Sequence, residues 1–159
     1  MNRRLKLPMV AEETRAPEAT EEVLRRSLGG PAEGDAGSAG RAVALRSQPE
    51  RPLVVLFEED GVYHLWVGQG RVRKVRREDL RDYEGALPPE QEAIARDILR
   101  LHALPEGAPV AFLQGDPPGS TGRGVLVERC RFGALVQASD GRRMAVGFRR
   151  VWRDDAWVN

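Results

Sequence analysis

The chain has 159 residues, an apolar fraction of 41% and a formal net charge of +1, so it can form one ordinary domain or two very small ones. Its 17 glycines and 11 prolines indicate many turns and some unstructured chain. The single cysteine excludes an intramolecular disulfide and a cysteine-based metal cage, and no apolar run reaches the length of a membrane span. We therefore expect a cytoplasmic protein that does not contact membranes.

Residues 1–50 show little periodic hydrophobicity, and the stretch 29–40 has the composition of a flexible linker. We expect a disordered or extended N-terminal arm that cannot build a core of its own. Two short segments interrupt it: a basic and apolar head at 3–7, and a short helix expected over 18–28 that is marginal alone in water. The apolar anchors of these segments are Leu5, Leu7, Leu24 and Leu28.

The region 51–104 changes to a pattern of strands followed by a helix. Apolar and β-branched runs on both sides of Asp60-Gly61 predict a hairpin, and a third run extends it to a β-meander over 53–76. The stretch 89–103 predicts a helix, with a proline near its start and acids in its first turn. The residues spaced for its buried face are Ile94, Ile98 and Leu101.

The region 105–159 is rich in short strand-like pieces, and Asp140-Gly141 marks another hairpin. Closely spaced short strands predict a small barrel. The pieces are 108–114, 124–130, 133–138, 142–147 and a closing turn at 148–152.

The two strand-rich regions also resemble each other at an offset of 71 residues. Five positions match within a window of about 27, which fits a tandem repeat and fits chance alternation in strands equally well. The matches are Val54 with Val125, Gly70 with Gly141, Arg71 with Arg142, Val75 with Val146, and Leu80 with Val151.

Residues 107–152 contain, in order, Gly-x-Pro-Val-x-Phe, Arg-Gly-Val-Leu-Val-Glu, Gly-Ala-Leu-Val, Asp-Gly-Arg, Met-Ala-Val and Arg-Arg-Val-Trp. This order resembles the small SH3-like barrels of the Tudor and KOW type, and the resemblance lies in strands and glycines, so it bears on fold more than on function. It implies a domain that binds proteins or nucleic acids and rarely catalyses reactions. The predicted fold class is mainly β with one helix (α+β): an arm over 1–50, a meander plus helix over 51–104, and an SH3-like barrel over 105–159.

The motifs that suggest chemistry do not form a complete site. The glycine-rich string at 115–122 lacks the lysine and the following helix of a phosphate-binding loop. His64 and His102 have no further ligand at metal-binding spacing, and Cys130 lies in an apolar strand without a nearby histidine. We therefore expect no cofactor, no metal and no enzymatic activity.

One cluster near the C-terminus combines arginines with aromatic residues. Such residues are enriched at interface hot spots and also stack on nucleic-acid bases. The alternative is that Phe148 and Trp152 close the barrel core while the arginines are merely exposed. The arginines are Arg129, Arg131, Arg142, Arg143, Arg149 and Arg150.

Two functions follow from these patterns. The first is a non-catalytic assembly or adaptor subunit that docks on a larger protein complex through its N-terminal arm and its β-barrel body. The second is a nucleic-acid-binding accessory protein that uses the arginine and aromatic surface of the C-terminal barrel. The expected partner-binding residues are Leu5, Leu7, Leu24, Leu28, Arg129, Arg131, Arg142, Arg143, Phe148, Arg149, Arg150 and Trp152.

Overall fold

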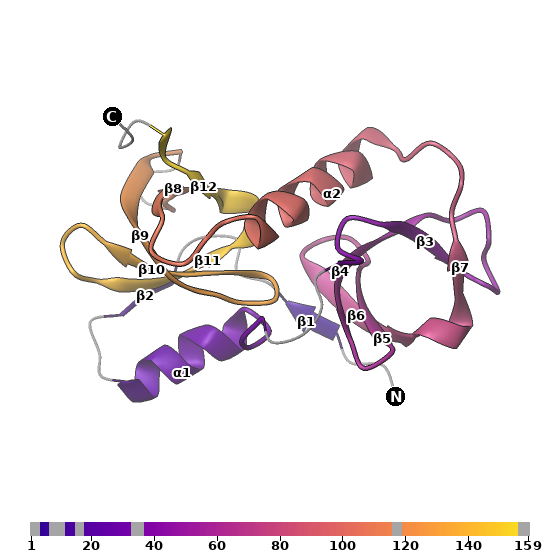
Figure 1. Cartoon of the computed structure of the whole chain (residues 1–159), viewed down its shortest axis with the longest axis horizontal. Coiled ribbons are helices and arrows are strands. Elements are labelled where there is room, and N and C mark those ends of the chain that lie inside the picture. The colour runs from indigo at the N-terminus through magenta and orange to yellow at the C-terminus, as the bar shows by residue number, and fades with distance from the viewer. Residues whose placement is uncertain (1–3, 7–11, 15–17, 33–36, 116–118, 156–159) are drawn as a thin grey trace. The chain divides into compact units, whose positions relative to one another are not determined.

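A computed structural model describes residues 4–6, 12–14, 18–32, 37–115 and 119–155 of the chain. The chain forms two compact units (Figure 1), and each unit combines a short N-terminal segment with a longer C-terminal one. Unit 1 comprises Met1–Lys6 and Glu33–Leu99, and unit 2 comprises Leu7–Ala32 and Arg100–Asn159.

Unit 1 contains an antiparallel sheet with the strand order β1-β6-β5-β4-β3-β7. The expected meander over 53–76 is present as β4, β5 and β6, and the turn between β4 and β5 has positive φ angles at both Asp60 (51°) and Gly61 (76°), as a two-residue hairpin requires. Its elements are β1 (Arg4–Lys6), β3 (Ala42–Leu45), β4 (Leu53–Glu59), β5 (Val62–Trp66), β6 (Arg71–Arg76), the 3-10 helix η1 (Arg77–Asp79) and β7 (Leu80–Asp82). The buried core residues of this sheet are Val43, Leu53, Val55, Tyr63, Leu65, Val75 and Leu80.

Helix α2 (Pro89–His102) follows the sheet of unit 1, and its last residues belong to unit 2. The expected buried face is confirmed, because Ile94, Ile98 and Leu101 are fully buried. In the described part of the chain, no helix has the length and apolar character that crossing a membrane requires.

Unit 2 contains a second antiparallel sheet, with the strand order β12-β8-β9-β10-β11-β2. The expected hairpin at Asp140-Gly141 is present between β10 and β11. The elements are β2 (Glu12–Thr14), α1 (Glu18–Ser27), β8 (Pro109–Leu113), β9 (Thr121–Arg129), β10 (Gly133–Ala138), β11 (Arg143–Gly147), the 3-10 helix η2 (Phe148–Arg150) and β12 (Val151–Arg153).

Helix α1 packs on this second sheet. Its apolar stripe buries Leu24 and Leu28 in a cluster with Cys130 and Leu135, and each buried leucine contributes about 1.5–3 kcal/mol relative to exposure. The helix is further held by a hydrogen bond and ion pair from Arg25 to Glu128, a contact that raises the pKa of Arg25 above its ordinary value. A helix that is marginal in isolation is therefore stabilised by tertiary packing.

The two sheets have the same topology. Read from one edge, unit 1 has β1-β6-β5-β4-β3-β7 and unit 2 has β2-β11-β10-β9-β8-β12. In both, three consecutive strands form a meander, and a 3-10 helix leads into the last strand. This last strand pairs with the strand that precedes the meander: β7 with β3 in unit 1, and β12 with β8 in unit 2. Even the short strands β1 and β2 pair with the corresponding strands β6 and β11.

The residue pairing confirms this equivalence in detail. Val54 pairs with Trp66 in unit 1, and Val125 pairs with Gln137 in unit 2, so both strands keep an offset of 71 residues. Both hairpins also skip one residue of the longer strand, Leu56 in β4 and Val127 in β9, at the same offset. A β-bulge at equivalent positions is a specific feature of a fold.

Backbone hydrogen bonds repeat in the same way. The amide of Arg77 donates to the carbonyl of Gly61 at 2.9 Å, and the amide of Phe148 donates to the carbonyl of Phe132 at 2.9 Å. Both donors begin a 3-10 helix. Of the two alternatives that the sequence left open, the structure supports the tandem repeat.

The predicted fold class, one helix with one small C-terminal barrel and an extended N-terminal arm, is wrong. Within the described residues the fold is mostly β, with two antiparallel sheets and two α-helices. The described parts of the N-terminal segment supply β1, β2 and α1 to the two units. Strand patterns reveal which residues form strands, but pairing between distant segments depends on tertiary contacts. The predicted division at 50 and 104 differs from the boundaries of the two units.

Candidate functional site

Basic side chains line three adjoining pockets on unit 1, with volumes of about 550, 420 and 680 Å³. The first pocket lies at β3, η1 and β7, and we call it the β7 pocket. It shares Arg46 with the third pocket, and the second and third share Leu45 and Arg73. We name the basic lining residues the arginine face: Arg41, Arg46, Arg51, Arg71, Arg73, Lys74, Arg76, Arg77 and Arg81.

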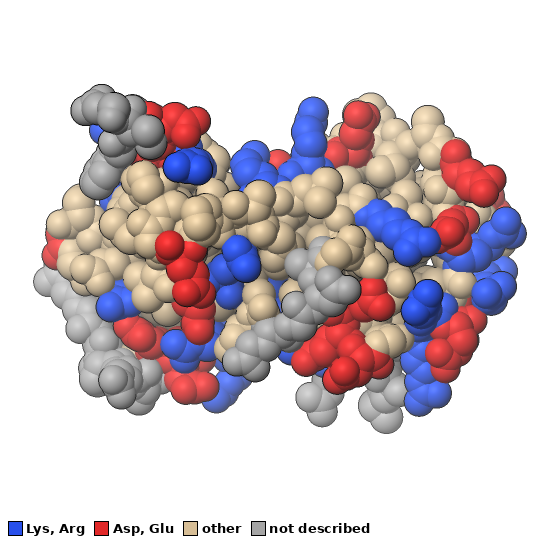
Figure 2. Space-filling model, viewed as in Figure 1, with Lys and Arg blue, Asp and Glu red and all other residues tan. Residues whose placement is uncertain are grey.

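The arginine face is positively charged although the whole chain is almost neutral. Nine basic side chains line the three pockets, against three acidic ones, Glu78, Asp79 and Asp82. On the face that Figure 2 shows, Lys and Arg side chains project from the right-hand end, where Figure 1 places β3 and β7, with carboxylates between them. A local excess of one sign attracts ligands of the opposite sign.

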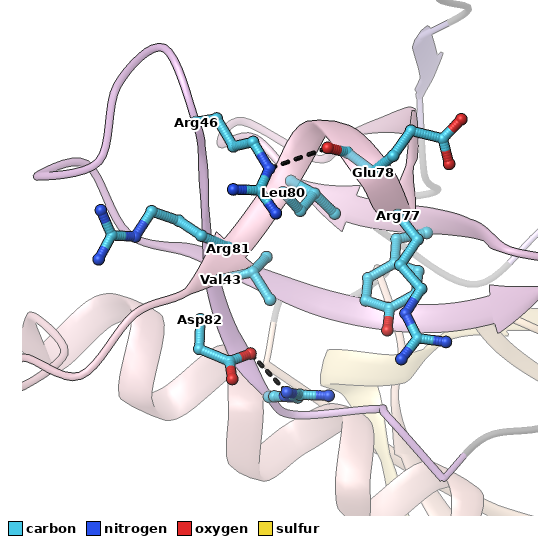
Figure 3. A pocket seen from close by; sticks show the side chains of 9 residues that line it. Val43, Arg46, Arg77, Glu78, Leu80, Arg81 and Asp82 are labelled. Atoms are coloured by element: carbon cyan, nitrogen blue, oxygen red, sulfur yellow. Dashed lines mark hydrogen bonds and ion pairs between the residues drawn. The ribbon is translucent and has the colours of Figure 1, made fainter.

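The β7 pocket has an apolar floor and a charged rim. Val43 and the buried Leu80 come from the neighbouring strands β3 and β7, and the buried ring of Tyr63 lines the same pocket. In Figure 3 the arginine side chains extend outward in different directions around Val43 and Leu80. Because these side chains start on β7, on the adjoining 3-10 helix and on the two residues that flank β3, the paired backbone fixes their spacing.

Two of the four arginines in this pocket are held by local contacts (Figure 3). The Nε of Arg46 donates to the backbone oxygen of Glu78 at 2.9 Å, and Arg41 forms an ion pair with Asp82. Both contacts join β3 or its flanking residues to the η1–β7 segment. These two contacts hold the η1–β7 side of the pocket rim against the residues that flank β3.

The other two arginines are directed to solvent. Within the described part of the chain, the exposed guanidinium groups of Arg77 and Arg81 make no hydrogen bond or ion pair. Arginine is always charged, and its planar group offers paired donors to phosphate or carboxylate oxygens. These two side chains are therefore the ones most available to an anionic ligand.

The equivalent positions in unit 2 show that the fold does not require these arginines. By strand register, the four arginines of the β7 pocket correspond to Ala108, Leu113, Phe148 and Trp152. All four replacements are apolar. The same backbone is thus built with and without these four arginines, while the acidic Glu78 and Asp82 of unit 1 correspond to Arg149 and Arg153 of unit 2.

The leucines expected to bind a partner lie in different environments. Leu24 and Leu28 are buried in unit 2 and belong to its core. The backbone of Leu5 pairs with Val72 as part of β1. Leu7 lies outside the described residues.

Internal contacts of unit 2 engage most of the C-terminal arginines of the expected cluster. Arg129 donates to the backbone oxygen of Leu104 at 2.7 Å, and Arg131 donates to that of Gly29 at 3.4 Å. Two more form ion pairs: Arg142 with Asp140 at 2.5 Å, and Arg143 with Glu21 at 3.3 Å.

The rest of the expected cluster does not form one exposed aromatic surface. Phe148 is buried, as the core alternative in the sequence analysis requires. Trp152 and Arg150 are half-buried, and Arg149 is exposed. The partner-binding role of this cluster stays a prediction.

Cys130 is fully buried beside α1, and desolvation raises the pKa of its thiol to about 12. The neutral thiol is therefore the form present near pH 7. Among the residues that the structure describes, no three His, Cys, Asp or Glu side chains come close enough together to hold a metal ion.

No protein-family model matches the chain, and no curated protein is similar to it at a significant level. The resemblance of 107–152 to SH3-like barrels stays a prediction. The sequence analysis did not identify the arginine face, although the basic run at 71–77 was a signal for part of it. The contributions of Arg41 and Arg46 could not be found in this way, since β3 meets β7 only in the folded sheet.

Proposed function

We propose that this protein is a non-catalytic accessory protein that binds nucleic acid through the arginine face of unit 1. The observation that carries the proposal is the concentration of nine basic side chains on three adjoining pockets. Four of these side chains, the arginines of the β7 pocket, stand where the second repeat has apolar residues. A cytoplasmic location is part of this proposal.

Phosphate groups account for the binding chemistry. A nucleic-acid backbone presents regularly spaced anions, and basic side chains that neutralise them release condensed counterions. Arginine supplies bidentate contacts to phosphate oxygens, which suits a face with eight arginines and one lysine. This location differs from the C-terminal cluster considered from the sequence, where four arginines are engaged in internal contacts.

The test compares matched double variants in the two units. Arg77→Ala with Arg81→Ala removes the two arginines most available on the arginine face, whereas Arg149→Ala with Arg150→Ala is the control in unit 2. Binding to a labelled single-stranded RNA of roughly 12 nucleotides is followed by fluorescence anisotropy over a range of salt concentrations.

The unit 1 variant should lose roughly tenfold or more in affinity, and the slope of log affinity against log salt should become shallower by about 0.7 for each phosphate that is no longer neutralised. The unit 2 variant should bind like the wild type. The proposal is wrong if only the unit 2 variant loses salt-sensitive binding, or if the wild type does not bind RNA or DNA.

An assembly subunit that docks on a larger complex is a second candidate function. The residue through which it can be tested is Val23, which is 55% exposed on α1 although its neighbour Leu24 is buried. Because a single exposed apolar side chain is ordinary on a protein surface, an effect of its substitution on partner binding would be specific evidence for docking. Val23→Asp should then reduce co-purification of a protein partner from the source cell without lowering the melting temperature, whereas Arg26→Ala on the same helix should leave both unchanged.

A further inference from the structure

The β7 pocket is larger and chemically more varied than phosphate binding alone requires. Its volume of about 550 Å³ lies in the range of pockets that hold small organic groups. A nucleic-acid backbone that only crosses the surface needs exposed cations and no concave apolar floor. The floor of Val43, Tyr63 and Leu80 belongs to the core of unit 1, and the pocket above it has room for part of a ligand.

The charged groups on the rim are of two kinds. Arg77 and Arg81 present donors to anionic oxygens, whereas the carboxylates of Glu78 and Asp82 accept hydrogen bonds. The carboxylate of Asp82 is already paired with Arg41. The carboxylate of Glu78 is repulsive to a phosphate unless it contacts a donor on the ligand. A ligand that fits this rim thus carries both an anionic group and nearby N–H donors.

A nucleotide unit has this combination. Its phosphate matches the arginines, the exocyclic amino group of a base matches a carboxylate, and the flat face of the base covers an apolar floor. In a duplex the base edges are paired and the faces are stacked, so a base reaches a pocket only when it is unpaired.

We propose that the β7 pocket receives one unpaired nucleotide, so that the arginine face binds single-stranded nucleic acid in preference to duplex. This inference rests on the proposed nucleic-acid function and names the form of nucleic acid that the site takes. The arginines hold the flanking phosphates, and Glu78 contacts the base edge.

The direction in which substitution of Glu78 changes the affinity for nucleic acid distinguishes this arrangement from simple phosphate binding. Glu78→Gln removes the negative charge beside the arginines but keeps an acceptor oxygen, whereas Glu78→Met removes both. If the ligand presents only phosphates, both substitutions strengthen binding to every nucleic acid. If Glu78 accepts a hydrogen bond from an unpaired base, Glu78→Met weakens single-strand binding while it strengthens duplex binding.

The experiment measures the affinities of the full chain for four probes of one mixed sequence: single-stranded RNA, single-stranded DNA and the two corresponding duplexes. Variants are Glu78→Met, Glu78→Gln and the matched control Glu84→Met, at an exposed carboxylate in unit 1 that does not line the pocket. Circular dichroism and thermal melting check that each variant is folded. The two single-stranded probes show whether the sugar hydroxyl contributes.

We expect wild-type affinity for single strands to exceed that for duplexes, and Glu78→Met to lower single-strand affinity by roughly threefold to tenfold relative to Glu78→Gln. Glu84→Met should affect single strands and duplexes alike. Equal affinities for single strand and duplex, or stronger binding of every probe by Glu78→Met, would overturn the single-strand inference and leave the proposed function intact. Absence of binding to all four probes would refute the proposed function itself.

Discussion

Unit 1 and unit 2 are two versions of one backbone, and they differ in what their equivalent positions do. Both share strand order, bulge position and the hydrogen bond that starts the 3-10 helix. At the start of that helix unit 1 has the exposed Arg77, and unit 2 has the buried Phe148. The shared features identify what the fold requires, and the differences identify what each unit adds.

The inner faces of the sheets agree most closely. Val55 corresponds to Leu126 and Leu65 corresponds to Val136, and all four side chains are fully buried. The outer surfaces diverge, because α1 covers the sheet of unit 2 while unit 1 carries the arginine face. Burial of an apolar inner face stabilises both units, whereas the surface is available for specialisation.

The largest expected difference between the units is at the first residue of the 3-10 helix. Phe148→Ala should lower the free energy of unfolding by about 3–5 kcal/mol, because it removes a buried aromatic side chain and leaves a cavity. The equivalent substitution Arg77→Ala should change it by no more than about 0.5 kcal/mol, because that side chain is exposed. Urea unfolding of both variants checks the pair, and similar losses in the two would contradict the assignment of one position to the core and the other to the surface.

A second difference concerns a strand position where unit 1 has Leu53 and unit 2 has Gly124. A Cβ atom added at Gly124 would lie 2.2 Å from the backbone oxygen of Gln137, whereas Leu53 is accommodated in the core of unit 1. Gly124→Leu should therefore destabilise the protein by about 1–3 kcal/mol through displacement of the β9–β10 pairing. Thermal unfolding gives the measurement.

The control for this substitution is Thr121→Ser, at the exposed start of the same strand. It should leave the melting temperature nearly unchanged, because the side chain is exposed and the hydroxyl is kept. A Gly124→Leu variant as stable as Thr121→Ser would show that the two repeats tolerate the same side chain at this position.

A third difference depends on pH, and near pH 7 it is the smallest of the three because the thiol is neutral in both the folded and the unfolded state. Cys130 occupies the position of Glu59 in unit 1, and burial raises the pKa of its thiol to about 12, above the roughly 8.5 of an unfolded cysteine. The folded state then holds a proton that the unfolded state releases, so this contribution to stability is complete below the unfolded pKa and is lost as the pH rises toward 12. In that interval the loss is about 1.4 kcal/mol per pH unit.

Comparison with Cys130→Ala isolates this contribution, because every other titrating group is common to the two proteins. Urea unfolding at several pH values from about 8 upward should show a steeper decline for the wild type than for the variant. Parallel declines would mean that the Cys130 thiol ionises as readily in the folded state as in the unfolded state.

Several elements were determined by the local sequence. The Asp60-Gly61 turn requires two residues that tolerate positive φ, and the hairpin forms where predicted. The apolar spacing of α2 likewise predicted its buried face, since Ile94 and Ile98 lie one turn apart. These features depend on a few neighbouring residues, so they can be read from the chain.

The tertiary structure decided the features that join distant segments. The sequence could not show that β1 pairs with β6, that β2 pairs with β11, or that Leu24 and Leu28 belong to the core of unit 2. The arginine face is of the same kind, because residues near 41–51 and 71–81 meet only when β3 pairs with β7. The physical reason is that local propensity fixes the form of each segment, while pairing between segments is selected by the burial and hydrogen bonds of the whole fold.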